Sequence, residues 1–238
     1  QCFWEGGVPP EALQLVPGSG ATVGERLATD PDVDVVILTG GTETARHLLQ
    51  QRPTINLLAE TGGKNATIVT AMSDREQALK HVLHSAFSHG GQKCSATSLL
   101  ILEQEVFDDE DFRETFKDAV ESLAVGSAWE LENRIGPLIR PPTGVMEAAL
   151  KELESGESWL VMPHCLENNP RLYSPAVKWN LQPGSVTHMT EFFGPVLGVM
   201  SANNLAEAVL LANQTGYGLT AGLESLDERE QQYWSEHI

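Results

Sequence analysis

Short apolar runs alternate with amphipathic, helix-like stretches along the first sixty residues. We expect strands over residues 13–16, 33–38 and 54–59, and helices over residues 20–28 and 42–50. Strands that alternate with helices are typical of a parallel sheet with helices on its faces. The glycines of Gly18-Ser19-Gly20 and Gly40-Gly41 mark turns from strand to helix. The pattern predicts an α/β fold.

A second series of elements follows Gly62-Gly63. Asp74 is a suitable N-cap for a helix with apolar residues at four-residue spacing, and a second such stripe follows. The two stripes are Ala78, Val82 and Ala86, then Phe112, Phe116 and Val120. Further strands are expected over residues 66–69, 97–102, 159–162 and 196–200, and a helix over residues 205–213. We therefore predict two α/β domains, residues 1–62 and 63–238.

Composition narrows the possible partners. The net charge is −18, from 33 acidic and 15 basic residues, which disfavours nucleic acid and anionic membrane surfaces. No apolar run approaches the roughly 20 residues that span a bilayer, and residues 1–13 do not resemble a secretory signal. The three cysteines, Cys2, Cys94 and Cys165, are too few for a disulfide framework and fit a reducing compartment.

One cysteine has flanks that suit a nucleophile. Cys94 lies in Gly90-Gly91-Gln92-Lys93-Cys94-Ser95-Ala96, where glycines allow close approach of a substrate and Lys93 supplies positive charge that favours the thiolate. An isolated cysteine can equally be a small core residue.

Two carboxylates are candidates for the same site. Glu60 ends an apolar strand before Gly62-Gly63, where open α/β sheets place ligands. If partly desolvated, it would have a raised pKa and suit general-base work on water. Glu191, in Glu191-Phe192-Phe193-Gly194-Pro195, could bind a ribose diol while Phe193 packs beside a nicotinamide ring. The alternatives are a solvated Glu60 and a turn with Phe193 in the core.

Two glycine-rich turns could face a pyrophosphate. Gly40, Gly41 and Glu43 follow an apolar strand and open a helix, where backbone amides can bind anions. Gly20 and Gly24 belong to a turn one residue longer than the dinucleotide-binding glycine motif, which is a weak signal.

Taken together, these motifs resemble the aldehyde dehydrogenase superfamily in order and spacing, over essentially the whole chain. The resemblance implies that residues 1–62 are the C-terminal part of a Rossmann-type NAD-binding domain and residues 63–238 a truncated catalytic domain. It implies Cys94 as nucleophile and Glu60 as general base, with Lys93 and Ser95 in the aldehyde pocket. The resemblance also implies NAD or NADP as cofactor, with the expected binding residues Glu191, Phe193, Gly40, Gly41, Glu43, Gly20 and Gly24.

Within the superfamily, Ala59 to Ala66 and Lys93 to Ala96 are most similar to glutamate γ-semialdehyde (1-pyrroline-5-carboxylate) dehydrogenases. The stretches 135–144 and 173–179 resemble the dehydrogenase half of bifunctional bacterial proline-utilisation proteins. By this resemblance the chain is an internal fragment, inactive alone. Its parent is a cytoplasmic homo-oligomer acting on a small aldehyde, and could be fused to a proline dehydrogenase domain.

Other interpretations remain open. The parent could oxidise another aldehyde, such as succinate semialdehyde, or the domain could serve folding or oligomer assembly without activity. His81, His84 and His89 are interpreted as helix-surface histidines and not as metal ligands.

Overall fold

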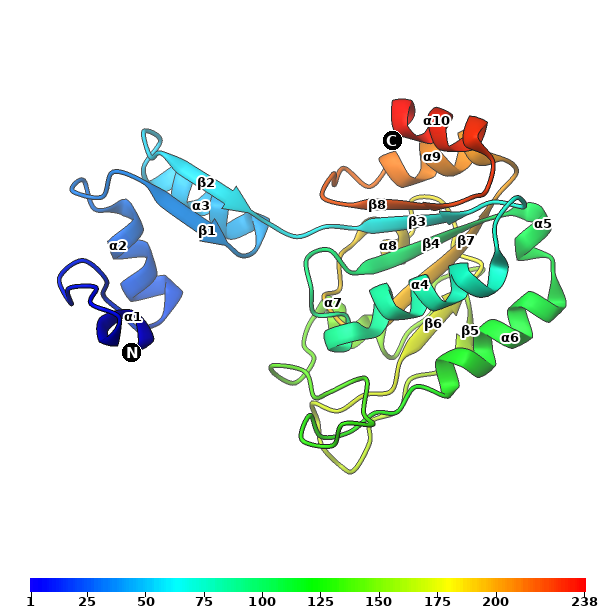
Figure 1. Cartoon of the computed structure of the whole chain (residues 1–238), viewed down its shortest axis with the longest axis horizontal. Helices are drawn as coiled ribbons and strands as arrows, with labels where there is room; N and C mark the ends of the chain where they lie inside the picture. Colours follow the sequence, from blue (N-terminus) through cyan, green and yellow to red (C-terminus); the bar gives the residue numbers. More distant parts are fainter. The chain divides into compact units, whose positions relative to one another are not determined.

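The computed structural model describes residues 1–238, which form two compact units, Gln1–Thr61 and Gly62–Ile238 (Figure 1). The division falls beside the paired glycines at which the sequence pattern changes. The roles of the two units as cofactor and catalytic domains remain predictions.

The first unit is a small parallel sheet with helices. Its two strands pair in parallel register, from Val36 opposite Leu57 to Thr39 opposite Glu60. Ala28, Leu48 and Ile55 form the small core beside them. Its elements are α1 (Cys2–Glu5), the π-helical turn η1 (Gly20–Gly24), α2 (Glu25–Thr29), β1 (Val36–Thr39), α3 (Thr42–Gln51) and β2 (Leu57–Glu60).

The prediction of a strand over residues 13–16 is wrong. This segment has no regular structure, and Leu15 is 81% exposed. The carbonyl of Leu13 accepts a hydrogen bond from the indole of Trp4 at 2.9 Å, so it bonds to a side chain and not to a neighbouring strand. Proline at position 17 then ends the apolar run without a backbone donor.

The second unit is built around a six-stranded sheet of order β5-β6-β7-β4-β3-β8, in which only the β5–β6 pair is antiparallel. Its strands are β3 (Asn65–Val69), β4 (Thr97–Glu103), β5 (Ser158–Val161), β6 (Ala176–Trp179), β7 (Val196–Ala202) and β8 (Ala221–Glu224). Its helices are α4 (Arg75–Phe87), the 3-10 segment η2 (Ser88–Gly91), α5 (Gln104–Phe107), α6 (Glu110–Glu121), α7 (Val145–Ala149), α8 (Val186–Met189), α9 (Leu205–Asn213) and α10 (Glu228–His237).

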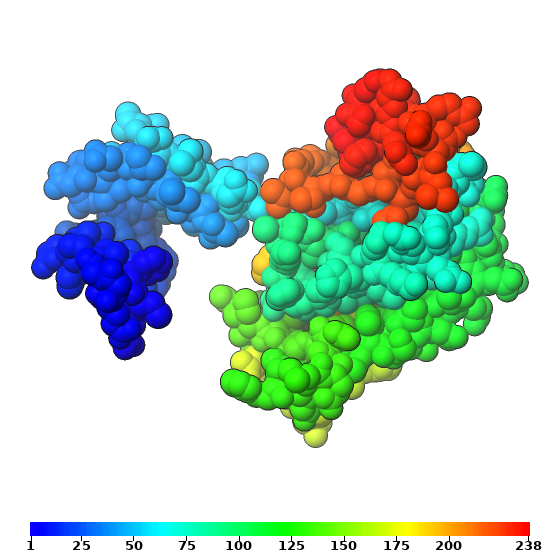
Figure 2. All heavy atoms as spheres, viewed as in Figure 1, coloured from blue at the N-terminus to red at the C-terminus, as the bar shows by residue number.

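An apolar cluster covers each face of this sheet. Buried residues of α4 and α6 pack with strand side chains in one cluster, and those of α9 pack with the alternate strand side chains in another. For example, Leu100 and Leu102 belong to the first cluster, and Leu99 and Ile101 to the second. Near-continuous burial along β4 is what a sheet covered on both faces requires. In Figure 2, α10 lies at the surface of this unit.

The two helical stripes expected from the sequence are confirmed. Asp74 caps α4 by accepting a hydrogen bond from the Gln77 amide at 3.0 Å, and all six stripe residues are buried. The connection over residues 135–156 contains the short helix α7, and β6 and β8 were not expected. None of the helices is long and apolar enough to cross a membrane.

Candidate active site

The segment that carries Cys94 lies between α4 and β4. It leaves α4 through three consecutive residues with left-handed backbone, His89, Gly90 and Gly91, with φ of 57°, 62° and 67°. This conformation is one that glycine adopts without strain. The turn leaves Cys94 exposed, which contradicts the alternative that this cysteine is a core residue.

Gly91 joins the cysteine segment to the segment of Glu191. A Cβ atom built on Gly91 would overlap the carbonyl of Gly194, so the two backbones approach more closely than any side chain would allow. Two motifs about a hundred residues apart in sequence therefore meet within the second unit. A small cleft lined by Gly63, Lys93, Ala96 and residues of both segments marks the contact.

The side chain of Asn65 anchors the cysteine segment to the sheet. Its amide nitrogen donates to the carbonyls of Cys94 at 2.7 Å and Ala96 at 2.9 Å, and its oxygen accepts from the Thr220 amide at 3.2 Å. Asn65 is only 3% exposed. One buried amide thus fixes the backbone of the candidate nucleophile.

The carboxylate of Glu191 is half-buried against the paired glycines. Its Oε1 accepts a hydrogen bond from the Gly63 amide at 3.2 Å, and a Cβ on Gly62 would overlap the carboxylate. Burial raises the pKa of Glu191, opposed by the Gly63 amide and by the charge of Lys64.

Phe193 points out of the core. It has φ of 55° and is 42% exposed, whereas its neighbour Phe192 is 6% exposed. The alternative that Phe193 is a core residue is therefore wrong, and Phe192 takes that place.

Lys64 is buried behind this cleft. Its ammonium group donates to the Ser98 carbonyl at 3.3 Å and lies 4.9 Å from the centre of the Phe192 ring. Burial lowers the pKa of Lys64 to about 7, while the carboxylate of Glu191 acts in the opposite direction. The lysine therefore links the strands β3 and β4 to the Glu191 segment.

The remaining candidate cofactor residues and Glu60 belong to the first unit. Gly20, Gly24 and Glu43 line one cavity of about 850 Å³ between the glycine turn and α3, whereas Gly40 and Gly41 do not line it. Glu60 ends β2 and is exposed, so the partial desolvation suggested for it is not found.

Lys93 and Ser95 flank Cys94, with Lys93 exposed and Ser95 half-buried. The Ser95 carbonyl accepts a hydrogen bond from the Thr220 hydroxyl at 3.5 Å. Among the histidines, His81 pairs with Glu224 at 2.9 Å and His84 contacts the Ser88 hydroxyl at 3.3 Å. No three His, Cys, Asp or Glu side chains are grouped as metal ligands.

Sequence reasoning missed Asn65 and Lys64 as parts of the site. Both were visible in the motif after Glu60, but their partners, the carbonyls of residues 94, 96 and 98, are backbone atoms. The signal that could have identified them is their place in the sequence: the polar residues Lys64 and Asn65 stand at the start of β3, a strand that is buried at every position.

The fold is α/β, and the segment that carries an exposed cysteine packs against the segment of Glu191 and Phe193. The sequence matches the aldehyde dehydrogenase family over residues 1–238, and the chain belongs to that family.

Known relatives include enzymes of several specificities. The betaine aldehyde dehydrogenase of Bacillus subtilis (strain 168) is 34% identical over 94% of this chain and 47% of its own length. The bifunctional protein PutA of Salmonella typhimurium is 35% identical over 94% of this chain and 18% of its own length. The chain thus spans about half or less of these curated relatives.

Solved structures agree with this fold. Proline Utilization A (PutA) from Corynebacterium freiburgense superimposes with a TM-score of 0.94 and 44% identity, over 99% of this chain and 24% of that one. A 1-pyrroline-5-carboxylate dehydrogenase from Thermus, solved with bound NAD, gives 0.87 and 31%, over 99% and 47%.

Proposed function

We propose that this chain carries the nucleophile for the NAD(P)-dependent oxidation of an aldehyde to a carboxylate through a cysteine thioester. The observation that carries the proposal is the construction of the Cys94 segment. Its cysteine is exposed, its carbonyl is held by Asn65, and Gly91 packs against the segment of Glu191 and Phe193.

The chemistry begins at the sulfur of Cys94. As a thiolate it attacks the aldehyde carbon, forming a C–S bond and placing negative charge on the former carbonyl oxygen. The Cys94 backbone amide is the proposed donor to that oxyanion. Loss of hydride from the same carbon restores the carbonyl and leaves a thioester on Cys94.

Each unit offers groups whose chemistry suits one part of a dinucleotide. The half-buried Glu191 carboxylate can accept hydrogen bonds from the nicotinamide ribose, and the exposed Phe193 ring can pack beside the nicotinamide. Gly20, Gly24 and Glu43 line a cavity large enough for part of such a molecule, with Gly40 and Gly41 at the neighbouring turn. When bound, the nicotinamide supplies the hydride acceptor.

Release of the product needs water at the thioester. We assign Glu60 as the base that takes a proton from this water, which then attacks the carbonyl carbon. The C–S bond breaks, the carboxylic acid leaves, and the Cys94 thiolate is regenerated while Glu60 holds the proton taken from water. The exposure of Glu60 leaves its side chain accessible to water.

The proposed substrate is glutamate γ-semialdehyde, oxidised to glutamate in proline catabolism. The match to PutA supports this choice over betaine aldehyde. Lys93 and Ser95, which flank Cys94, would line the aldehyde pocket, since a cation and a hydroxyl suit a small polar substrate. We further propose that the parent protein is a homo-oligomer that could include a proline dehydrogenase domain. We also propose a cytoplasmic location, because three free cysteines fit a reducing compartment.

The proposal is tested in the full-length parent protein. Cys94→Ala is expected to abolish NAD(P)H formation from glutamate γ-semialdehyde, whereas Cys165→Ala, which changes another exposed cysteine, keeps near-normal turnover. The enzyme is supplied with glutamate γ-semialdehyde, succinate semialdehyde or betaine aldehyde, and mass spectrometry of the products identifies the substrate. Retained turnover in Cys94→Ala would refute the nucleophile, and a preference for another aldehyde would refute only the substrate.

A non-catalytic, structural role is tested on the chain itself. Because the chain spans about half or less of its curated relatives, we expect no turnover from it alone. Thiol labelling followed by peptide mass spectrometry should nevertheless show Cys94 reacting faster than Cys2 and Cys165, which are also exposed. Equal rates at all three cysteines would favour the structural role.

A further inference from the structure

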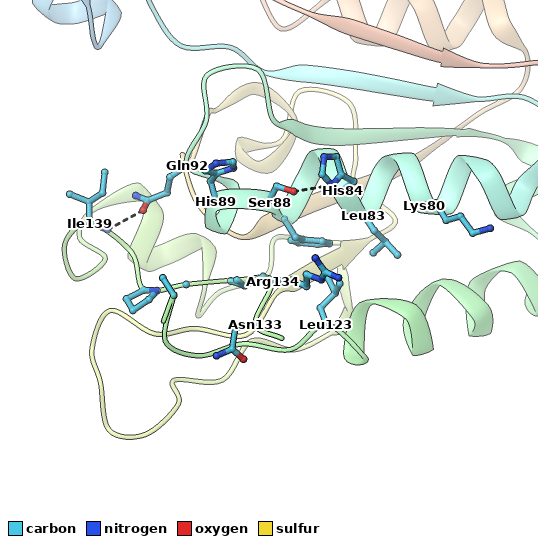
Figure 3. A pocket seen from close by; sticks show the side chains of 15 residues that line it. Lys80, Leu83, His84, Ser88, His89, Gln92, Leu123, Asn133, Arg134 and Ile139 are labelled. Carbon is cyan, nitrogen blue, oxygen red and sulfur yellow. Dashed lines mark hydrogen bonds between the residues drawn. The ribbon is translucent and has the colours of Figure 1, made fainter. Parts of the chain in front are cut away.

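A second cavity of about 960 Å³ lies in the second unit, and none of the candidate catalytic or cofactor residues lines it (Figure 3). One wall is α4 with its 3-10 continuation, and the other is the loop that carries Arg134 and Ile139. The motif Gly90–Ala96 and the stretch 135–144, both noted above for other reasons, border it, and the proposed thioester chemistry uses none of its lining side chains.

The cavity is cationic in a strongly acidic protein. Its titratable lining groups are Lys80, His84, His89 and Arg134, and no Asp or Glu lines it. The chain as a whole has 33 acidic and 15 basic residues. The cavity is therefore a positively charged region in a protein whose net negative charge otherwise repels anions.

The ammonium group of Lys80 and the guanidinium group of Arg134 have no partners within the protein. Lys80 and Arg134 form no ion pair or side-chain hydrogen bond, whereas Lys151 and Arg229 on the same unit are both paired with carboxylates. His84 contacts only the Ser88 hydroxyl, at 3.3 Å. Unpaired guanidinium and ammonium groups that share one cavity leave their donors available to an anion.

The remainder of the lining is largely apolar. Leu83 and Leu123 are partly buried and Ile139 is 70% exposed, so these side chains present hydrocarbon to the cavity above the buried Phe87 and Ile135. An apolar lining with a few converging polar groups is typical of sites for small organic molecules. A bare inorganic anion would leave this hydrocarbon surface unused.

The cavity is connected to the cysteine segment. The side-chain oxygen of Gln92, which lines the cavity, accepts a hydrogen bond from the Ile139 amide at 3.0 Å. Gln92 is two residues from Cys94, so the wall of the cavity and the segment of the nucleophile share one short stretch of backbone.

We infer that this cavity binds a small organic carboxylate of several carbons, with its charge on Arg134 and Lys80 and its hydrocarbon on Leu83 and Leu123. The inference does not depend on the proposed thioester chemistry. It concerns binding alone and can be tested on a chain that has no turnover.

The test is calorimetric titration of this chain with glutarate, a five-carbon dicarboxylate, at low ionic strength. Glutarate is expected to bind saturably, whereas glutaramide, its neutral diamide, and inorganic phosphate, which lacks hydrocarbon, bind at least about tenfold more weakly, a difference of about 1.4 kcal/mol. Arg134→Gln and Lys80→Gln should each weaken glutarate binding by about tenfold or more.

The matched control is Lys117→Gln, which removes a positive charge from α6, outside the cavity. It should leave glutarate affinity within about twofold of the original chain, with circular dichroism showing that all variants are folded. The inference is overturned if glutarate does not saturate, if glutaramide or phosphate binds as tightly, or if Lys117→Gln weakens binding as much as Arg134→Gln.

Discussion

Replacing Asn65 with alanine should destabilise the second unit and release the cysteine segment. The side chain makes three hydrogen bonds, to the carbonyls of Cys94 and Ala96 and from the amide of Thr220. Each such bond contributes about 1 kcal/mol net, and a buried acceptor left unpaired costs more. We therefore expect Asn65→Ala to lower the free energy of unfolding by about 3 kcal/mol.

The assay is urea unfolding followed by circular dichroism. With a slope of about 2 kcal/mol per molar urea, a loss of about 3 kcal/mol lowers the midpoint by about 1.5 M. Asn203→Ala is the control, because the amide of Asn203 is exposed and donates only to Glu207. That variant should lose no more than about 0.5 kcal/mol.

The same variant reports on the site. Once the Cys94 carbonyl loses its bond to Asn65, the cysteine segment should sample more conformations, and the rate of Cys94 labelling under native conditions should change. A loss of under about 1 kcal/mol, equal to that of Asn203→Ala, would refute the view that this amide holds the segment.

Two further substitutions test the packing of the site. Gly91→Ala should lower the free energy of unfolding by at least about 2 kcal/mol, because the left-handed backbone and the Gly194 carbonyl leave no room for a Cβ. The control is Gly136→Ala, where no atom lies near the added Cβ, and it should cost under about 1 kcal/mol. Equal costs for the two variants would contradict the close approach of Gly91 to Gly194. Lys64→Met removes a group whose pKa is lowered to about 7 from 10.5. The unfolded chain keeps this proton while the folded one loses it, so the original protein gains stability relative to the variant as pH rises from about 7 towards 10.5. Urea unfolding at several pH values should show this gain, Lys117→Met should not remove it, and parallel profiles for Lys64→Met and the original chain would contradict it.

The sequence predicted the elements whose side chains repeat with a clear period. The stripes of α4 and α6 are buried as expected because each helix has one apolar face against the sheet. The strand β6 was missed because it is short and contains Lys178, which is buried at 3% exposure beside Glu157. Burial of an ion pair depends on partners distant in the sequence and leaves no apolar pattern.

The motifs indicated which segments to compare, but they could not show how the segments pack. The sequence placed glycines beside Cys94 and Glu191, yet it could not show that Gly91 rests on the Gly194 carbonyl. It also suggested a core position for Phe193 as one alternative, because the left-handed backbone that exchanges the places of Phe192 and Phe193 is not visible in composition. Such features depend on tertiary contacts between backbones.

The edge strand β8 affects how the second unit can be completed during synthesis. It pairs with β3, the first strand of the unit, and the neighbouring Thr220 amide bonds to Asn65 across a separation of 155 residues. A nascent chain still lacking residues 220–224 has β3 as an open edge, and its thiol-bearing turn is missing one of the contacts that order it. The Cys94 segment therefore gains its last ordering contact only after nearly all of the unit has been synthesised.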